Sequence, residues 1–436
     1  MSILLTAVAV CVVLVLLLLF VRRTEAGLSC LLAVELFNLA FGSNAALVGH
    51  LHLNAMDVVS MVLLAAGAVR FVRNLRILSF SRMVAAGYLI FFVLSFARGC
   101  DANGLLAAAN ESRGFIGPLA AMAYFADTPV DEESLRRIVR LYLLFGAALC
   151  AAIILAATGL QVGMSALFTA PDDRLLPSSA AAVVAICGFL ALARATYFAQ
   201  WLPDLLWPGI FFFAAIYLRH RTVWMMLLAG TVALAFIDRR LFRWMAPTAL
   251  VATFVVAGIA IYSGDKPGLA SESDFAQSLS NRSTWQWRVN GWQEFLFESE
   301  QTPLTILAGK PMGDGWQRID VETHLLQTAP PHSEYVTEYL RVGVAGLVLT
   351  LLFACGPLLA LWRPHDLDNC AIYPSISIWA VIVLIVLVYG AAYSIEPEAY
   401  ALIGIANAIA VSTRAREGRL DLARYGIEEA SPGLAG

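Results

Sequence analysis

Charged residues are scarce in this chain. Only 14% of its 436 residues are Asp, Glu, Lys or Arg, whereas 60% are apolar and the mean hydropathy is +0.74. A soluble domain of this length cannot bury that much apolar surface, but a lipid bilayer can accommodate it. The net charge is only −3, so the chain lacks the basic surplus that a nucleic-acid partner requires. A membrane protein is therefore the expected class.

Cysteine spacing of the kind that builds metal or disulfide sites is also missing. The seven cysteines are scattered, mostly within apolar runs, and none forms a Cys-x-x-Cys pair. We therefore expect no zinc site and no disulfide framework. The first apolar run, residues 3–20, has no basic residues before it and no Ala-x-Ala-like cleavage site after it. This pattern predicts a retained membrane span rather than a signal peptide.

Apolar runs long enough for a membrane span follow one another along the chain. A spanning helix needs roughly 20 mostly apolar residues. We predict an all-α polytopic membrane protein with about 12–13 transmembrane helices and one large loop. The predicted spans cover residues 3–20, 28–48, 55–71, 83–97, 114–126, 138–158, 178–198, 205–218, 222–237, 246–262, 335–362, 372–393 and 396–412. The chain thus divides into amino-terminal helices (1–262), a loop (263–334), carboxy-terminal helices (335–412) and a tail (413–436).

The arginines give these spans an orientation. Counted from an outside amino terminus, most arginines fall in cytoplasmic segments, as the positive-inside bias requires. The same count leaves the polar residues 263–332 outside, as one periplasmic loop. The cytoplasmic arginines are Arg22, Arg23, Arg70, Arg73, Arg76, Arg82, Arg136, Arg137, Arg140, Arg239, Arg240, Arg243, Arg363, Arg414, Arg416, Arg419 and Arg424.

Two groups of arginines fall on the outer side, where the bias makes them rare. One is Arg98 with Arg113, and the other is Arg219 with Arg221. Each can anchor the end of a helix by extending to the interface. As a set they also suit the binding of an anion, and the sequence leaves both interpretations open.

The periplasmic loop carries an amphipathic segment, residues 285–297. Four of the ten tryptophans of the chain lie in the loop. Arg288 flanks the apolar face of the segment, where a guanidinium can bind a phosphate at the level of the lipid headgroups. An interfacial helix with a simple anchoring arginine is the alternative. The apolar face has helical spacing and consists of Trp285, Val289, Trp292 and Leu296.

The end of the loop places a histidine at the start of a span. Two prolines precede His332, and Ser333 is a candidate cap for the helix that follows. Neutral imidazole at this position makes a plausible general base. Earlier in the loop, residues 309–315 predict a tight turn. A metal site is a minor alternative because its spacing fits no known pattern; it would use Asp320, Glu322, His324 and His332.

A known family resembles this arrangement. His332-Ser333-Glu334-Tyr335 followed by Gly343-Val344-Ala345-Gly346 is similar to the His-Asn/Ser-x-aromatic … Gly-x-x-Gly signature of the O-antigen ligase and O-antigen polymerase superfamily. Its glycines have the small-xxx-small spacing that permits close helix packing. Arg221-Thr222 resembles the Ser-Arg-x-x-Trp pattern, with His220 where serine is usual, and Arg288 matches the arginine of the family's loop. The motifs cover about residues 200–412; ten spans precede the loop, where members often have nine.

The resemblance implies a metal-independent, inverting glycosyltransferase in the bacterial cytoplasmic (inner) membrane. The expected donor is an undecaprenyl-diphosphate-linked glycan, and the acceptor is a second glycan or lipid A core. Guanidinium groups would stabilise the leaving diphosphate in place of a metal or other cofactor. Besides membrane lipid, no further partner is implied. The implied roles are catalysis by His332, diphosphate binding by Arg221, Arg288, Arg98 and Arg219, and glycan stacking by Trp285 and Trp292.

Three functional hypotheses remain at this point. Ten acidic residues against five basic ones over residues 263–334 favour a polymerase over a ligase, because the phosphates of lipid A core would favour a basic surface. A polysaccharide transporter or flippase is a third hypothesis, although no internal repeat is evident. Glu35 and Asn38 lie one turn apart within the second span. An ionisable group at that depth indicates function, but the sequence shows no partner for it.

Overall fold

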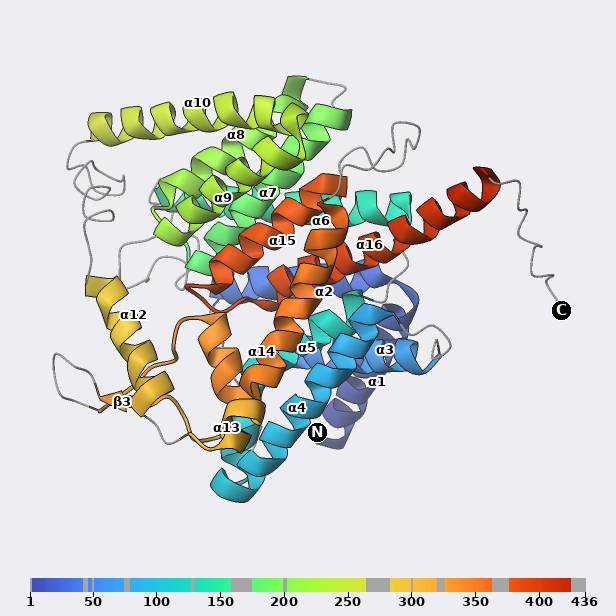
Figure 1. Cartoon of the computed structure of the whole chain (residues 1–436), viewed down its shortest axis with the longest axis vertical. Helices are drawn as coiled ribbons and strands as arrows, with labels where there is room; N and C mark the ends of the chain where they lie inside the picture. The colour runs from blue at the N-terminus through green and yellow to red at the C-terminus, as the bar shows by residue number, and fades with distance from the viewer. Residues whose placement is uncertain are drawn as a thin grey trace.

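The computed structural model describes most of the chain. Described are residues 2–41, 46–48, 51–73, 79–126, 130–157, 175–198, 202–263, 283–298, 301–319, 326–362 and 376–424. Within these ranges the chain is almost wholly helical (Figure 1). A helix lies at each of the predicted spans.

Thirteen helices correspond to the predicted spans within the described residues. Six are long and apolar enough to cross a membrane, and four shorter stretches are also apolar. The protein is therefore a multi-pass membrane protein. The helices are α1 (Ser2–Arg22), α2 (Thr24–Phe41), α3 (Ala55–Arg73), α4 (Phe80–Asn103), α5 (Leu105–Phe125), α6 (Glu132–Ala157), α7 (Ser178–Phe198), α8 (Leu202–Tyr217), α9 (Arg221–Ile237), α10 (Arg239–Ser263), α14 (Glu334–Leu361), α15 (Ile376–Gly390) and α16 (Pro397–Arg424).

Two short hairpins depart from an all-helical chain. The predicted second span, 28–48, was too long, because α2 ends at Phe41. Strand β1 (Ala46–Val48) then pairs with β2 (Leu51–Leu53), and Leu47 lies opposite His52. In the predicted loop, β3 (Gln317–Ile319) pairs with β4 (Leu326–Thr328), with Arg318 opposite Gln327. Both pairs are antiparallel, and each strand has only three residues.

Burial follows the distribution of apolar residues around each helix. Helix α7 is apolar on all sides, and 83% of its most apolar 18-residue stretch is buried against neighbouring helices. A helix of this kind belongs in the centre of a bundle. The corresponding stretch of α10, by contrast, is only 22% buried. Helix α10 lies along one edge of the molecule in Figure 1. Its exposed residues, such as Phe254 at 69%, would face lipid.

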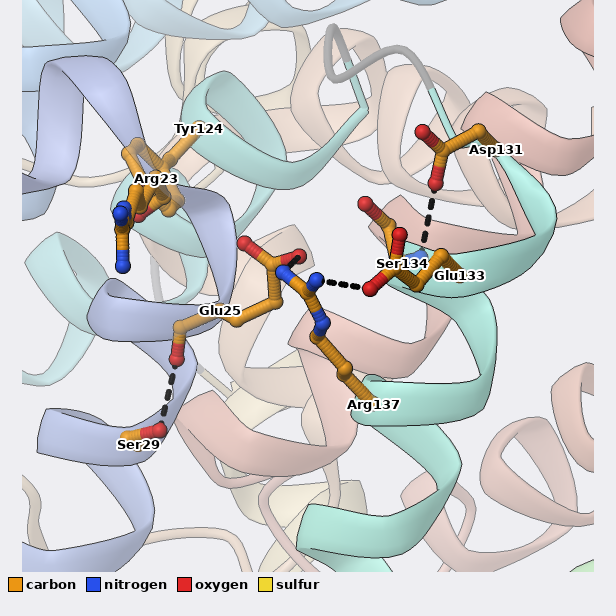
Figure 2. Close-up of polar contacts among 8 residues, drawn as sticks. All are labelled: Arg23, Glu25, Ser29, Tyr124, Asp131, Glu133, Ser134 and Arg137. Carbon is orange, nitrogen blue, oxygen red and sulfur yellow. Dashed lines mark hydrogen bonds and ion pairs between the residues drawn. The ribbon is translucent and has the colours of Figure 1, made fainter.

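Polar contacts tie the first helices together at one end of the bundle. Arg70 donates to the carbonyl oxygens of Phe20 (2.5 Å) and Val21 (3.3 Å). Tyr124 donates to the Arg23 carbonyl at 3.2 Å, and Arg137, which lies next to Glu25 in Figure 2, approaches its carboxylate at 3.6 Å. These arginines belong to the groups that the sequence assigns to a single side of the membrane, and the structure brings them to the same end.

The opposite end of the bundle carries the loop elements. Helix α12 (Ser283–Gln293), a π-helical turn η1 (Glu294–Glu298) and the short helix α13 (Pro303–Ala308) lie there. In Figure 1, α12 and β3 lie at the left, on the far side of the molecule from the carboxyl terminus. The predicted helix over 285–297 is thus present, although its last turn is π-helical. We refer to this side of the bundle as the His332 end.

Residues 309–315 contain the predicted turn, at Met312 and Gly313, and the segment is partly buried against the helices around it; we call it the buried loop. The Gly309 carbonyl accepts from Arg98 (2.8 Å), and the Lys310 carbonyl accepts from Ser95 (2.9 Å), both on α4. Met312, two residues after Lys310, is fully buried. A Cβ on Gly313 would overlap the backbone of α5, so only glycine permits this approach. The buried loop therefore inserts between α4, α5 and α14.

Gly343 kinks α14 to make room for α13. Its backbone has φ 74° and ψ −174°, which interrupts the helix. A Cβ at this position would overlap the Leu307 carbonyl oxygen of α13. The sequence predicted that Gly343 and Gly346 permit close packing of helices. For Gly343 the close neighbour is the backbone of α13, a loop helix.

Replacing Gly343 with alanine should destabilise the protein much more than replacing Gly315. Both glycines have φ near 75°, but nothing lies within 4 Å of a Cβ on Gly315. Gly315→Ala should therefore cost only backbone strain, about 1–2 kcal/mol. Gly343→Ala adds a clash with backbone that cannot give way. Thermal unfolding of both variants in detergent measures the difference, and equal losses would contradict the role of Gly343.

Candidate functional site

Helix α12 docks on the segment that leads into α14. The indole nitrogen Nε1 of Trp292 donates to the Pro331 carbonyl at 2.5 Å. The Trp287 ring lies 5.7 Å from the His332 ring, centroid to centroid. Gly291 is buried and Phe295 is 7% exposed, so these two residues mark the face that packs inward. The loop helix therefore holds His332 at the mouth of a span.

His332 sits on a strained backbone. Its φ is 52°, in the left-handed region that non-glycine residues rarely adopt. Such strain costs about 1–3 kcal/mol and persists only where the surroundings enforce it. The backbone N–H of Glu334, two residues on, donates to the Tyr393 carbonyl at 3.2 Å. Ser333 stands at the cap position, but its buried side chain makes no capping hydrogen bond. The histidine is thus fixed by its neighbours.

Arg288 points to the loop between α15 and α16. Its Nη1 donates to the Ala392 carbonyl at 3.0 Å, and its guanidinium carbon lies 4.5 Å above the centroid of the Tyr393 ring. Its Nε is buried and has no hydrogen-bond partner among the described residues. A buried donor without an acceptor costs about 1–3 kcal/mol. An anionic ligand would supply that acceptor.

The start of α9 lies at the same end of the bundle. The Nε2 of His220 lies 2.9 Å from the Leu176 carbonyl, just before α7. At the start of α7, the Ser178 hydroxyl is 3.2 Å from the Tyr389 hydroxyl, and Tyr389 stacks on Tyr393 at 5.3 Å. Tyr393 in turn lies beneath Arg288. These contacts bring the half-buried Arg221 and Arg219, which flank His220, to the end of the bundle that carries Arg288.

Arg219 has an unusual backbone, with φ 60°. It closes α8, where its N–H donates to the Ile216 carbonyl at 3.2 Å. Together with His332 it is one of two non-glycine residues with positive φ among the described residues. Both therefore lie in segments of strained backbone at the His332 end.

Two of the outward arginines have structural contacts. Arg98 donates to the buried loop at Gly309, and none of its described contacts reaches His332 or Arg288. Arg113 forms an ion pair with Asp57 of α3 at 2.7 Å. For Arg113 the anchoring interpretation fits. Arg98 clamps the buried loop with one nitrogen.

Several predicted residues lie outside the described part of the chain. The side chain of Trp285 is one, although its backbone belongs to α12. Asp320, Glu322 and His324 are three others, so the alternative metal site falls there. Within the described residues, no three His, Cys, Asp or Glu side chains are grouped to hold a metal.

A buried ion pair was missed by the sequence analysis. Arg341 is 1% exposed, and its guanidinium lies 2.6 Å from Glu111 Oε1. The other carboxylate oxygen of Glu111 accepts from the N–H of Gly313. Arg341 also donates to the Gly315 carbonyl at 2.5 Å and lies 4.1 Å above the Trp316 ring. This pair fastens the buried loop to α5 and α14.

Two buried carboxyl groups on α14 were also missed. Glu334 accepts from the Tyr400 hydroxyl at 2.6 Å and from the Ile395 N–H at 2.9 Å. Glu338 is fully buried and accepts from the Tyr88 hydroxyl at 2.8 Å. A signal was available, since Glu334, Glu338 and Arg341 recur at i, i+4 and i+7 on one face of an apolar helix.

Lys310 adds a second cation beside Arg341. Partial burial lowers the pKa of its ammonium group, and the nearby charge of Arg341 lowers it further, while Asp314 opposes the change. Both cations belong to the surroundings of the buried loop. The positive charge at the His332 end is therefore not confined to the outward arginines.

No protein-family model matches the chain, and no curated protein matches its sequence. The geometry of the site therefore carries the functional argument.

Proposed function

We propose that the protein is a glycosyltransferase that takes a glycan from a polyprenyl diphosphate and passes it to an acceptor hydroxyl. The observation that carries the proposal is the position of Arg288. Its buried Nε has no hydrogen-bond partner among the described residues. Arg288 lies on α12 together with Trp287, whose ring lies next to that of His332. A cation for the leaving diphosphate and a base for the acceptor hydroxyl would then both lie at the His332 end of the bundle. The resemblance to the O-antigen ligase and polymerase superfamily supports the same reaction.

The arginines would stabilise the leaving diphosphate. A guanidinium binds phosphate oxygens through parallel N–H bonds, which suits charge that develops as the bond to the sugar breaks. Arg288 is proposed as the principal group, together with Arg221 at the same end of the bundle. Arg219 is a weaker candidate, and Arg98 is weaker still because it already binds Gly309.

His332 would accept the proton of the attacking hydroxyl. The acceptor oxygen forms a bond to the anomeric carbon while the bond from that carbon to the diphosphate oxygen breaks. The proton moves to the imidazole, and the diphosphate leaves with the electron pair. A single displacement inverts the anomeric configuration. Trp292, whose N–H fixes Pro331, would also offer its ring to a sugar.

We favour a polymerase, with a lipid-linked glycan as acceptor, over a ligase acting on lipid A core, because acidic residues predominate over residues 263–334. The proposed site would face the periplasm, from the bacterial inner membrane. That side follows from the arginine pattern of the sequence.

Arg288→Lys should lose glycan transfer almost as completely as Arg288→Ala. Lysine keeps the positive charge but loses the planar fork. Polymer made in cells measures this, with the amount of membrane-inserted protein measured in parallel. Arg239→Lys, at an exposed position at the other end of the bundle, is the matched control and should retain activity. Normal polymer from Arg288→Lys at normal protein levels would refute diphosphate binding by Arg288.

Cation-coupled transport of a polysaccharide is the second candidate function. The observation in its favour is the set of buried carboxyl groups at the His332 end, including Glu334, Glu338 and Glu398. Buried acids of this kind mark ion pathways in transporters. If vesicles that contain the protein transport the glycan across their membrane and no new glycosidic bond forms, transport would be favoured over transfer.

A further inference from the structure

A small pocket lies next to the loop between α15 and α16, which also contacts Arg288. It is formed by α7, α9, α15 and the start of α16, and has room for about one water-sized particle, about 10 Å³. Such a volume admits a single water or a monatomic ion and excludes an organic ligand. Its polar lining consists of Ser179, Tyr389, Glu396 and Glu398. The pocket is separate from the groups proposed for glycan transfer.

One carboxylate oxygen of Glu398 lacks a partner in the described part of the chain. Its side chain is 1% exposed, and its Oε2 has no hydrogen-bond partner among the described residues. A carboxylate buried in this way is costly unless a cation or a donor satisfies it. The backbone around it is firmly placed, since the Glu398 carbonyl accepts from Tyr142 at 2.7 Å. The unsatisfied oxygen is therefore held in position.

Three acidic side chains gather at this pocket. Glu35, on α2, and Glu396 both lie within electrostatic reach of the Glu398 carboxyl group. Among the described residues, no lysine or arginine forms an ion pair with any of these three acids. The three acids thus have no cationic partner within the described part of the protein. Glu35, whose role the sequence left open, belongs to this group.

We propose that the pocket binds a monovalent metal cation such as Na⁺, with Glu398 and Glu396 as the principal ligands. Carboxylate and hydroxyl oxygens suit a hard cation, and the hydroxyl-bearing Ser179 and Tyr389 complete the polar lining. A divalent ion fits less well, because among the described residues no three His, Cys, Asp or Glu side chains are grouped to hold one. The site also has no room for the waters that Mg²⁺ retains.

The cation site shares a loop with the proposed transfer site. Residues 391–396 join α15 to α16. Ala392 and Tyr393 of this loop contact Arg288, and Glu396 reaches the pocket. The cation site does not rest on the proposed glycan transfer, since its residues and its ligand are different. It can be tested without any glycan.

Thermal unfolding in detergent tests the site on the full chain. At constant ionic strength, NaCl should raise the melting temperature in a saturable way relative to choline chloride, because an ion that binds only the folded state stabilises it. Glu398→Gln and Glu396→Gln should both lose the shift. Glu396 is exposed, so its replacement leaves the packing intact and serves if Glu398→Gln fails to fold.

Asp101→Asn is the control, because Asp101 is exposed at the end of α4 and its replacement removes the same charge. It should keep the Na⁺ shift. Equal melting temperatures in NaCl and choline chloride would overturn the proposal. So would a shift produced by Ca²⁺ or Mg²⁺ alone, or one that survives in Glu396→Gln. Binding of radioactive ²²Na⁺ to the purified protein tests the site directly, and the proposal predicts that Glu396→Gln abolishes this binding.

Discussion

Replacing His332 with asparagine or glutamine should reduce glycan transfer by about 10²–10⁴-fold, the usual contribution of a general base. Either amide can hydrogen-bond to a hydroxyl, but neither can take up its proton. Asparagine also tolerates the left-handed backbone at this position, where φ is 52°. It therefore removes the base without adding strain. Product formed by membranes that contain equal amounts of each variant is the measurement.

His324→Gln is the matched control for this experiment. His324 lies in the same predicted loop, outside the described residues. The general-base account expects the variant to remain active, whereas the alternative metal site expects it to fail together with His332. Wild-type product from His332→Asn would remove the general-base role. Loss of both variants from the membrane would indicate that the loop needs its histidines for folding.

Breaking the ion pair between Arg341 and Glu111 should cause the largest loss of stability. Arg341→Met leaves the Glu111 carboxylate, whose side chain is 9% exposed, without its cation. Removing one partner of a buried pair typically costs about 3–5 kcal/mol. It would also release the Gly315 carbonyl and the buried loop. Thermal unfolding of the purified protein measures the change.

The double variant Glu111→Gln/Arg341→Met separates charge from packing. It should recover part of the lost stability, because no uncompensated charge remains. Glu133→Gln, which breaks the exposed pair with Arg137 on α6 (Figure 2), is the control and should leave the melting temperature unchanged. If Arg341→Met behaves like Glu133→Gln, the pair does not hold the buried loop.

The membrane helices were predictable because hydropathy acts locally. Each apolar run carries its own signal, so the thirteen membrane helices could be located without knowing their neighbours. The docking of α12 beside His332 was less accessible. The sequence indicated an amphipathic helix with Arg288 at its flank, but not that Trp287 would adjoin His332 or that Tyr393 would lie beneath Arg288.

Contacts between distant segments could not be predicted from a single sequence. Residues 309–315 were predicted to form a tight turn, since their glycines are what a turn requires, but not to pack against α4, α5 and α14. Their burial depends on Arg341 and Glu111, which are distant in sequence. Glu35 likewise acquires its neighbours only when α2 meets the start of α16. A local sequence pattern indicates the chemistry that a residue can perform, whereas the fold determines which residues it contacts.

Reconstituted glycan transfer in the presence of a chelator tests the central claim most directly. The purified protein would receive a polyprenyl-diphosphate-linked glycan and an acceptor, with EDTA to remove divalent ions. We predict that new glycosidic product forms in EDTA at the same rate as in Mg²⁺, because Arg288 and Arg221 are proposed to take the place of a metal. The variants Arg288→Lys and His332→Asn should leave the donor unreacted. Product that requires a divalent ion, or that persists in both variants, would contradict the account.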